Sequence, residues 1–210
     1  MSNSLYDDKH PNSSLKGVGF KDEKSAFRTI HLVNKRSPKY QFDVINTMYY
    51  RAKHHPKITS DMKKAMKIYK FWLKKEYPKL REQDYPFLPL KLVKKFENLA
   101  DDYGVSEVAR GKKKSQKSSK GFLVVYKNVH GKSGKLYYKP VFKNYPSGPD
   151  YASLRQKFIK SRLAQMKSTD TPFFYTDGYY KGLPTKQHLI LIMHAYSPYP
   201  KILKKIAKIL

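Results

Sequence analysis

The sequence predicts a mainly helical α+β protein. We expect an N-terminal three-helix bundle, a linker helix, and a C-terminal domain in which helices pack on a small β-hairpin sheet. Apolar residues recur at helical spacing through residues 20–78, and the pattern becomes β-rich after Gly121. With 210 residues, 40% of them hydrophobic, the chain is large enough for one large or two small packed domains.

The predicted bundle spans residues 20–78 and follows an extended arm at residues 1–19. Its first helix is expected over 24–35. The second begins at Pro38, a position where the missing N–H is not needed, and stops at His54-His55-Pro56. The segment Thr59-Ser60-Asp61 caps the third helix, and Pro78 is expected to end it.

Residues 79–120 are predicted to form a linker that contains one helix and a lysine-rich hinge. The helix runs from Leu90 to Tyr103, and Gly104 closes it. Residues 99–110 have the spacing of a helix-turn-helix motif, but the second helix would be very short. An ordinary corner between two helices is therefore favoured over a DNA-reading motif.

Residues 121–210 are predicted to form the α+β domain. Two β-rich runs, Phe122–Val129 and Lys135–Lys143, flank His-Gly-Lys-Ser-Gly and indicate a hairpin. Pro140 makes the second run an edge strand or a broken one. A further short strand pair is expected around Asp177-Gly178.

The rest of this domain is expected to be helical. Asp150 caps one helix. Residues 184–196 indicate a buried helix, although their periodicity also allows a buried strand. Residues 201–210 are predicted to form a basic amphipathic helix. We interpret its apolar side as a candidate docking face, and it consists of Ile202, Leu203, Ile206, Ile209 and Leu210. Such a face suits a partner groove, an anionic bilayer or the protein's own domain.

The charge predicts that the protein binds large anionic or acidic partners. There are 44 Lys and Arg against 16 Asp and Glu, a formal net charge of +28. Residues 1–80 hold 18 basic and 7 acidic side chains, residues 81–120 hold 10 and 6, and residues 121–210 hold 16 and 3. A plain solubility coat usually mixes both signs, so nucleic acid, an acidic protein face or an anionic lipid surface is favoured.

One short run concentrates this charge and is a candidate polyanion-binding site. It consists of Lys112, Lys113, Lys114, Lys117 and Lys120. Contact with phosphates there would release counterions and depend steeply on salt. The same run also fits a nuclear-import tag or a soluble linker.

Catalysis is not expected. The sequence has no Walker loop, dinucleotide fingerprint or nucleophile elbow, and its histidines lack the spacing of metal ligands. It has no cysteine for a disulfide or a thiolate metal site. We therefore expect no catalytic residues, no metal, no cofactor and no small-molecule substrate. No signal peptide or membrane-spanning segment is predicted either.

Two stretches carry a resemblance. NTMYYRAKHHP (46–56) followed by TSDMKKAMKIY (59–69) resembles a small basic helical module in proteins of large double-stranded DNA viruses of algae and amoebae. GFLVVYKNV, YPSGPDY and GLPTKQHL in the second half are similar to the same giant-virus proteins, with no activity attached. The resemblance implies a virion or virus-factory protein, made in the host cytoplasm or the factory.

Together these observations predict a structural virion component. The expected role is that of a minor capsid protein that cements the inner face of an icosahedral shell through basic and aromatic surfaces. Its expected partners are other capsid proteins, with DNA and an anionic inner membrane surface as further candidates. The alternative is a non-specific nucleic-acid-binding protein for viral genome packaging or transcription, and an enzyme ranks third.

Overall fold

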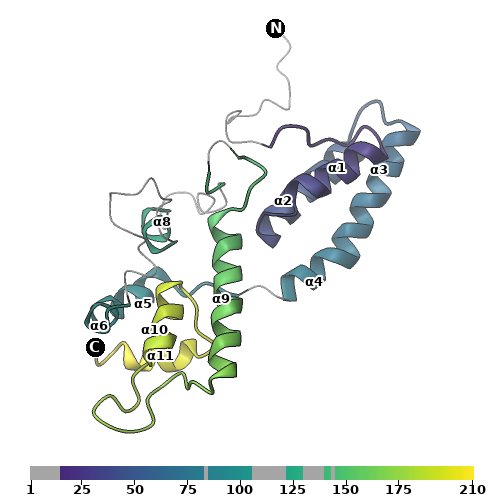
Figure 1. The fold of residues 1–210 in the computed structure, drawn as a ribbon. Coiled ribbons are helices and arrows are strands. Elements are labelled where there is room, and N and C mark those ends of the chain that lie inside the picture. Colours follow the sequence, from purple (N-terminus) through teal and green to yellow (C-terminus); the bar gives the residue numbers. More distant parts are fainter. Residues whose placement is uncertain (1–14, 83–84, 106–121, 130–139, 143–144) are drawn as a thin grey trace. The chain divides into compact units, whose positions relative to one another are not determined.

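The computed structural model describes residues 15–82, 85–105, 122–129, 140–142 and 145–210 (Figure 1). It is mainly helical, with 62% helix. The chain divides into two compact units. The first unit comprises Met1–Asp84 and Tyr138–Ser153, and the second comprises Tyr85–Tyr137 and Leu154–Leu210.

The first unit contains the three helices predicted for the N-terminal half. They are α1 (Glu23–Val33), α2 (Pro38–Lys53) and α3 (Ser60–Phe71). The Asp22 side chain caps α1, and Thr59 caps α3 by accepting the Met62 N–H at 3.2 Å. Most of the buried apolar side chains of this unit form one core, made of Leu15, Ala26, Val33, Ile45, Met48, Ala65, Tyr69 and Trp72.

The prediction that Pro78 ends the third helix is wrong. The helix continues through η1 (Trp72–Glu76), a π-helical turn, into α4 (Tyr77–Glu82) as one long rod beside α1 and α2 (Figure 1). In a regular helix the proline ring clashes with the carbonyl four residues earlier. Here the Tyr77 N–H donates to the Trp72 carbonyl, five residues back, and this wider turn makes room for the ring.

Within the first unit, a buried carboxylate fastens residues 145–153 to the start of α2. One oxygen of Asp150 accepts the Ser153 N–H at 2.7 Å and caps α9 (Tyr151–Ser168). The other accepts both the backbone N–H and the hydroxyl of Ser37, the residue before α2, at 3.0 Å each. Desolvation raises the pKa of Asp150 above its ordinary value, although these hydrogen bonds act in the opposite direction.

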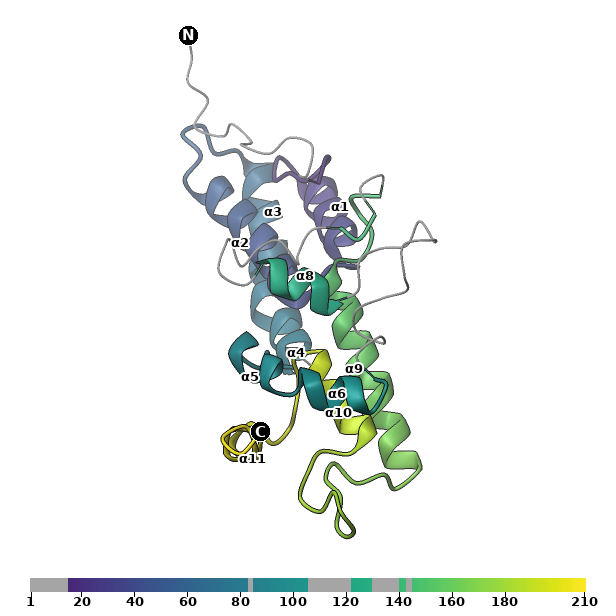
Figure 2. The same ribbon diagram turned by 90° about the vertical axis from the view of Figure 1, so that its left-hand side faces the viewer.

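The second unit is built from helices around its own core, and all of them except α9 have at most eight residues. They are α5 (Leu90–Lys95), α6 (Glu97–Asp102), α8 (Phe122–Val129), most of α9, α10 (Lys186–Met193) and α11 (Pro200–Ile206). In Figure 2, α10 lies beside α6 and α9. The helix predicted from Leu90 to Tyr103 is divided at Phe96, and both halves contribute to this core.

A buried arginine connects the loops of the second unit. Arg155 of α9 is 2% exposed, and its guanidinium donates to the carbonyls of His194, Tyr85, Pro86 and Ala195 at 2.7 to 3.2 Å. The same group lies 3.8 Å from the centre of the Phe87 ring. Its planar set of donors thus ties residues 85–87 to the end of α10.

The predicted β-hairpin and the α+β fold class are wrong, since the described residues contain no β-strand. The run Phe122–Val129 forms α8, with Phe122, Leu123 and Tyr126 buried at helical spacing. A continuous apolar run fits a helix as well as a buried strand, and here packing decides for the helix. Of the second run, 135–143, only 140–142 are described, and Pro140 makes an isolated bridge with Asp150.

The strand pair expected around Asp177-Gly178 is a loop instead. It is closed by an isolated bridge between Phe174 and Pro184 and by a hydrogen bond from the Gly182 N–H to the Tyr175 carbonyl at 2.9 Å. Gly178 has a φ of 71°, as the turn expected there requires. One bridge does not make a β-ladder. The sequence therefore predicts the position of the turn correctly, but the strands expected on either side of it are absent.

Candidate functional site

The long helix at residues 60–82 carries an exposed basic surface. Its inner side, with Ala65, Tyr69 and Trp72, is buried in the core of the first unit. Only three acidic residues lie along it. Its eight basic residues are all exposed, and they are Lys63, Lys64, Lys67, Lys70, Lys74, Lys75, Lys79 and Arg81.

Five of these lysines follow one line, which we call the lysine stripe: Lys63, Lys67, Lys70, Lys74 and Lys79. The first four are separated by four, three and four residues, the spacing that keeps side chains on one side of an α-helix. Lys79 comes five residues after Lys74. It stays in line with the other four lysines because the π turn adds one residue to the helical turn between them. At 1.5 Å per residue the stripe is about 24 Å long.

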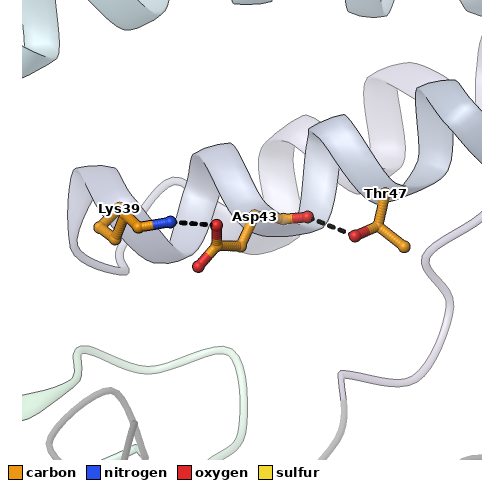
Figure 3. Close-up of polar contacts among 3 residues, drawn as sticks. All are labelled: Lys39, Asp43 and Thr47. Carbon is orange, nitrogen blue, oxygen red and sulfur yellow. Dashed lines mark hydrogen bonds and ion pairs between the residues drawn. The ribbon is translucent and has the colours of Figure 1, made fainter. Parts of the chain in front are cut away.

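Most of the stripe is not neutralised by the protein itself. Lys79 pairs with Glu76 at 3.0 Å, an exposed pair that contributes little to stability. Lys63, Lys67, Lys70 and Lys74 make no ion pair with any other described residue. Helix α2 differs, because its Lys39 pairs with Asp43, whose carbonyl also accepts the Thr47 hydroxyl at 2.6 Å (Figure 3).

Exposed phenylalanines lie next to basic residues on both α3 and α1. Phe71 is 61% exposed and lies on α3 four residues after Lys67, three before Lys74 and four before Lys75. On α1, Phe27 is also 61% exposed and lies between Lys24 and Arg28 on the same helix. A cationic surface with aromatic side chains among the charges offers both phosphate contacts and stacking surfaces.

The structure locates only part of the residues singled out from the sequence. The candidate polyanion-binding run, Lys112 to Lys120, lies outside the described residues. In the candidate docking helix, Leu203 and Ile206 are buried in the core of the second unit, as expected if that side packs on its own domain. The predicted helix over 201–210 is too long, because α11 ends at Ile206. Ile202 on the helix is 43% exposed, and Ile209 and Leu210 after it are 81% and 49% exposed, so the five residues do not form one face.

Two buried histidines of the second unit, His188 and His194, have strongly perturbed pKa values. His188 Nδ1 lies 2.9 Å from the Phe173 carbonyl, and its Nε2 lies 2.8 Å from the Ser197 hydroxyl. His194 Nδ1 lies 2.8 Å from the Ile190 carbonyl, and its ring stacks on Phe158 at 4.0 Å. Desolvation lowers the pKa of both His188 and His194 to about 4.

The pairing of His188 with Ser197 has the geometry that activates a serine nucleophile, but not the accessibility. Because a carbonyl accepts from Nδ1–H, Nε2 accepts the proton of the Ser197 hydroxyl. The two residues are 0% and 5% exposed, and the Ser197 oxygen also accepts the Tyr199 N–H at 2.9 Å. The arrangement therefore holds the residues after α10 against the Phe173 loop.

The described residues offer no grouping of three or more histidine, aspartate or glutamate side chains able to hold a metal ion. Among them, no helix is long and apolar enough to cross a membrane. No model of a known protein family matches the chain, and no curated protein is significantly similar to it in sequence.

Sequence reasoning missed the lysine stripe. The prediction for this helix rests on its apolar residues, which identify the side packed in the core. It makes no use of the lysines on the opposite side. The signal is nevertheless present in the 4-3-4 spacing of Lys63, Lys67, Lys70 and Lys74. The sequence does not predict that the stripe extends to Lys79, because a proline at position 78 is expected to end the helix.

Proposed function

We propose that the protein binds nucleic acid without sequence specificity through the lysine stripe. The observation that supports this most directly is a row of lysines about 24 Å long, four of which have no ion-pair partner among the described residues. Ammonium groups on flexible stems contact phosphates as point charges, and contacts to phosphates carry no sequence information. The stripe therefore favours the backbone of DNA or RNA.

Salt dependence tests this proposal. Each phosphate neutralised on a single strand contributes about −0.7 to the slope of log K against log salt, and on duplex DNA about −0.9. The triple variant Lys67→Gln, Lys70→Gln, Lys74→Gln is thus expected to make the slope on single-stranded DNA shallower by about 2. Fluorescence anisotropy with labelled oligothymidylate and with a short duplex, between roughly 50 and 200 mM salt, gives both slopes.

Helix α9 offers a matched control. Lys157, Lys160 and Lys167 are exposed lysines on a helix of the second unit. Their triple change to Gln removes the same charge from the protein. If this control weakens binding as much as the stripe variant does, the total charge drives binding and the stripe is not the site.

The lysine run at residues 112–120 is proposed as an additional polyanion contact. Changing Lys112, Lys113, Lys114, Lys117 and Lys120 to Gln in the full chain is expected to make the slope shallower by up to about 3.5 on single-stranded DNA. An unchanged slope would leave the import or linker role for this run.

A structural virion role is the second proposal, supported by the exposed apolar side chains of the second unit. Tyr179 is 95% exposed and Ile209 81%, and neither belongs to the lysine stripe. Such residues suit contacts with other capsid proteins or with an anionic inner membrane surface. A minor capsid protein that also holds the genome would use both surfaces. Its absence from purified virus particles would contradict this role.

A further inference from the structure

We infer that the site at the lysine stripe prefers single-stranded nucleic acid, because it offers Phe71 as a stacking surface. This inference rests on the proposed function and specifies the ligand of the same site. Phe71 is 61% exposed although it belongs to the helix whose inner side forms the core. Three lysines, Lys67, Lys74 and Lys75, lie three or four residues from it, the spacing that places side chains next to one another on a helix.

The second exposed phenylalanine lies on the same side of the helix pair. Helices α1 and α3 pack together, and Glu23 of α1 lies close enough to Lys64 of α3 to raise the pKa of that lysine, after the larger effect of Asp61. Phe27 follows Glu23 by one turn, and Phe71 follows Lys64 by two turns. Each ring therefore lies on the same side of its own helix as the residue, Glu23 or Lys64, that approaches the other helix.

The chemistry of the ligand follows from this combination. A duplex presents phosphates to a basic helix, but its base faces are stacked on one another and unavailable to a side chain. A single strand offers phosphates and open base faces together, and stacking on an aromatic residue adds about 1–3 kcal/mol per base, or about 5- to 150-fold in affinity. An anionic bilayer would also accept lysines and a phenylalanine, so it forms one arm of the test.

The experiment compares Phe71 variants of the full chain on oligothymidylate, on a short duplex and on phosphatidylserine vesicles at one salt concentration. Phe71→Ala and Phe71→Leu are expected to weaken binding to oligothymidylate by about 5- to 150-fold and to leave duplex binding unchanged. Phe71→Tyr keeps the stacking surface and is expected to bind like the original chain. Phe142→Ala, at a phenylalanine 58% exposed outside the long helix, is the matched control and is expected to change nothing.

Three outcomes would overturn the inference. The first is an unchanged affinity of Phe71→Ala for oligothymidylate. The second is an equal loss of affinity of Phe71→Ala for both nucleic acids, and the third is an affinity of Phe71→Leu equal to that of the original chain. Loss of vesicle binding alone would assign Phe71 to a lipid surface. The stripe variant separates this inference from the proposed function: if it weakens binding while Phe71→Ala does not, only the stacking role fails.

Discussion

Acid should destabilise the second unit through its two buried histidines. In the folded protein the pKa values of His188 and His194 are about 4, against an ordinary value of 6.5. The unfolded chain therefore binds more protons than the folded protein between these values. The stability due to the neutral rings is complete above about pH 6.5 and is lost as the pH falls toward 4.

The size of the effect follows from linkage. At about pH 5 each histidine contributes a loss of about 2 kcal/mol relative to pH 7.5, so the pair contributes about 4 kcal/mol. That is a large part of the 5–15 kcal/mol, roughly, by which a domain is usually stable. Both side chains are at most 5% exposed, so solvent screening reduces the value little.

Urea unfolding at about pH 7.5 and pH 5 measures this effect, and each unit has its own probe. Trp72 is the only tryptophan and reports the first unit by fluorescence. Pulsed hydrogen exchange of peptides from α10 reports the second. The double variant His188→Gln, His194→Gln should lose stability at neutral pH but lack the steep pH dependence. A urea midpoint for α10 exchange that is the same at both pH values would refute the reasoning. A double variant whose stability depends on pH as steeply as that of the original chain would refute it too.

Two further substitutions test the buried polar contacts. Arg155→Met removes the guanidinium donor from four backbone carbonyls, of which only that of Ala195 is known to keep another donor, the Leu88 N–H. It should lower the free energy of unfolding of the second unit by about 4 kcal/mol, measured on the α10 peptides. Arg155→Lys should lower the free energy of unfolding by less. If Arg155→Met lowers it by under about 1 kcal/mol, the Arg155 hydrogen bonds do not hold these loops together. Asp150→Ala removes a helix cap and both contacts to Ser37, and should destabilise the first unit by about 3 kcal/mol in Trp72 fluorescence. Asp150→Asn should lose less than Ala, and equal losses would rule out the capping role.

The elements predicted correctly are those with local signals. The start of α2 follows from Pro38, that of α3 from Thr59, and that of α9 from Asp150, since caps and helix-start residues act within one turn. The apolar residues of α1, α2 and α3 recur at helical spacing because each helix turns one side toward the same core. These features depend on residues a few positions apart, and a sequence displays them directly.

The errors arose where distant packing decides. Phe122–Val129 is apolar at almost every position, so its period could not separate strand from helix, and its burial against α5, α6 and α10 determined the outcome. The π turn before Pro78 depends on the Trp72 to Tyr77 hydrogen bond, which has no sequence signature. The contacts of Arg155 join residues about 40 and 70 positions away in the chain, beyond the reach of local patterns.

The lysine stripe as a nucleic-acid contact is the central claim, and lysine footprinting tests it most directly. The full chain is acetylated briefly with and without oligothymidylate, and mass spectrometry measures the modification of each lysine. Protection of Lys63, Lys67, Lys70 and Lys74 is expected, with Lys157 and Lys160 of α9 modified equally in both samples. Equal modification of the four stripe lysines with and without bound oligothymidylate would contradict the account.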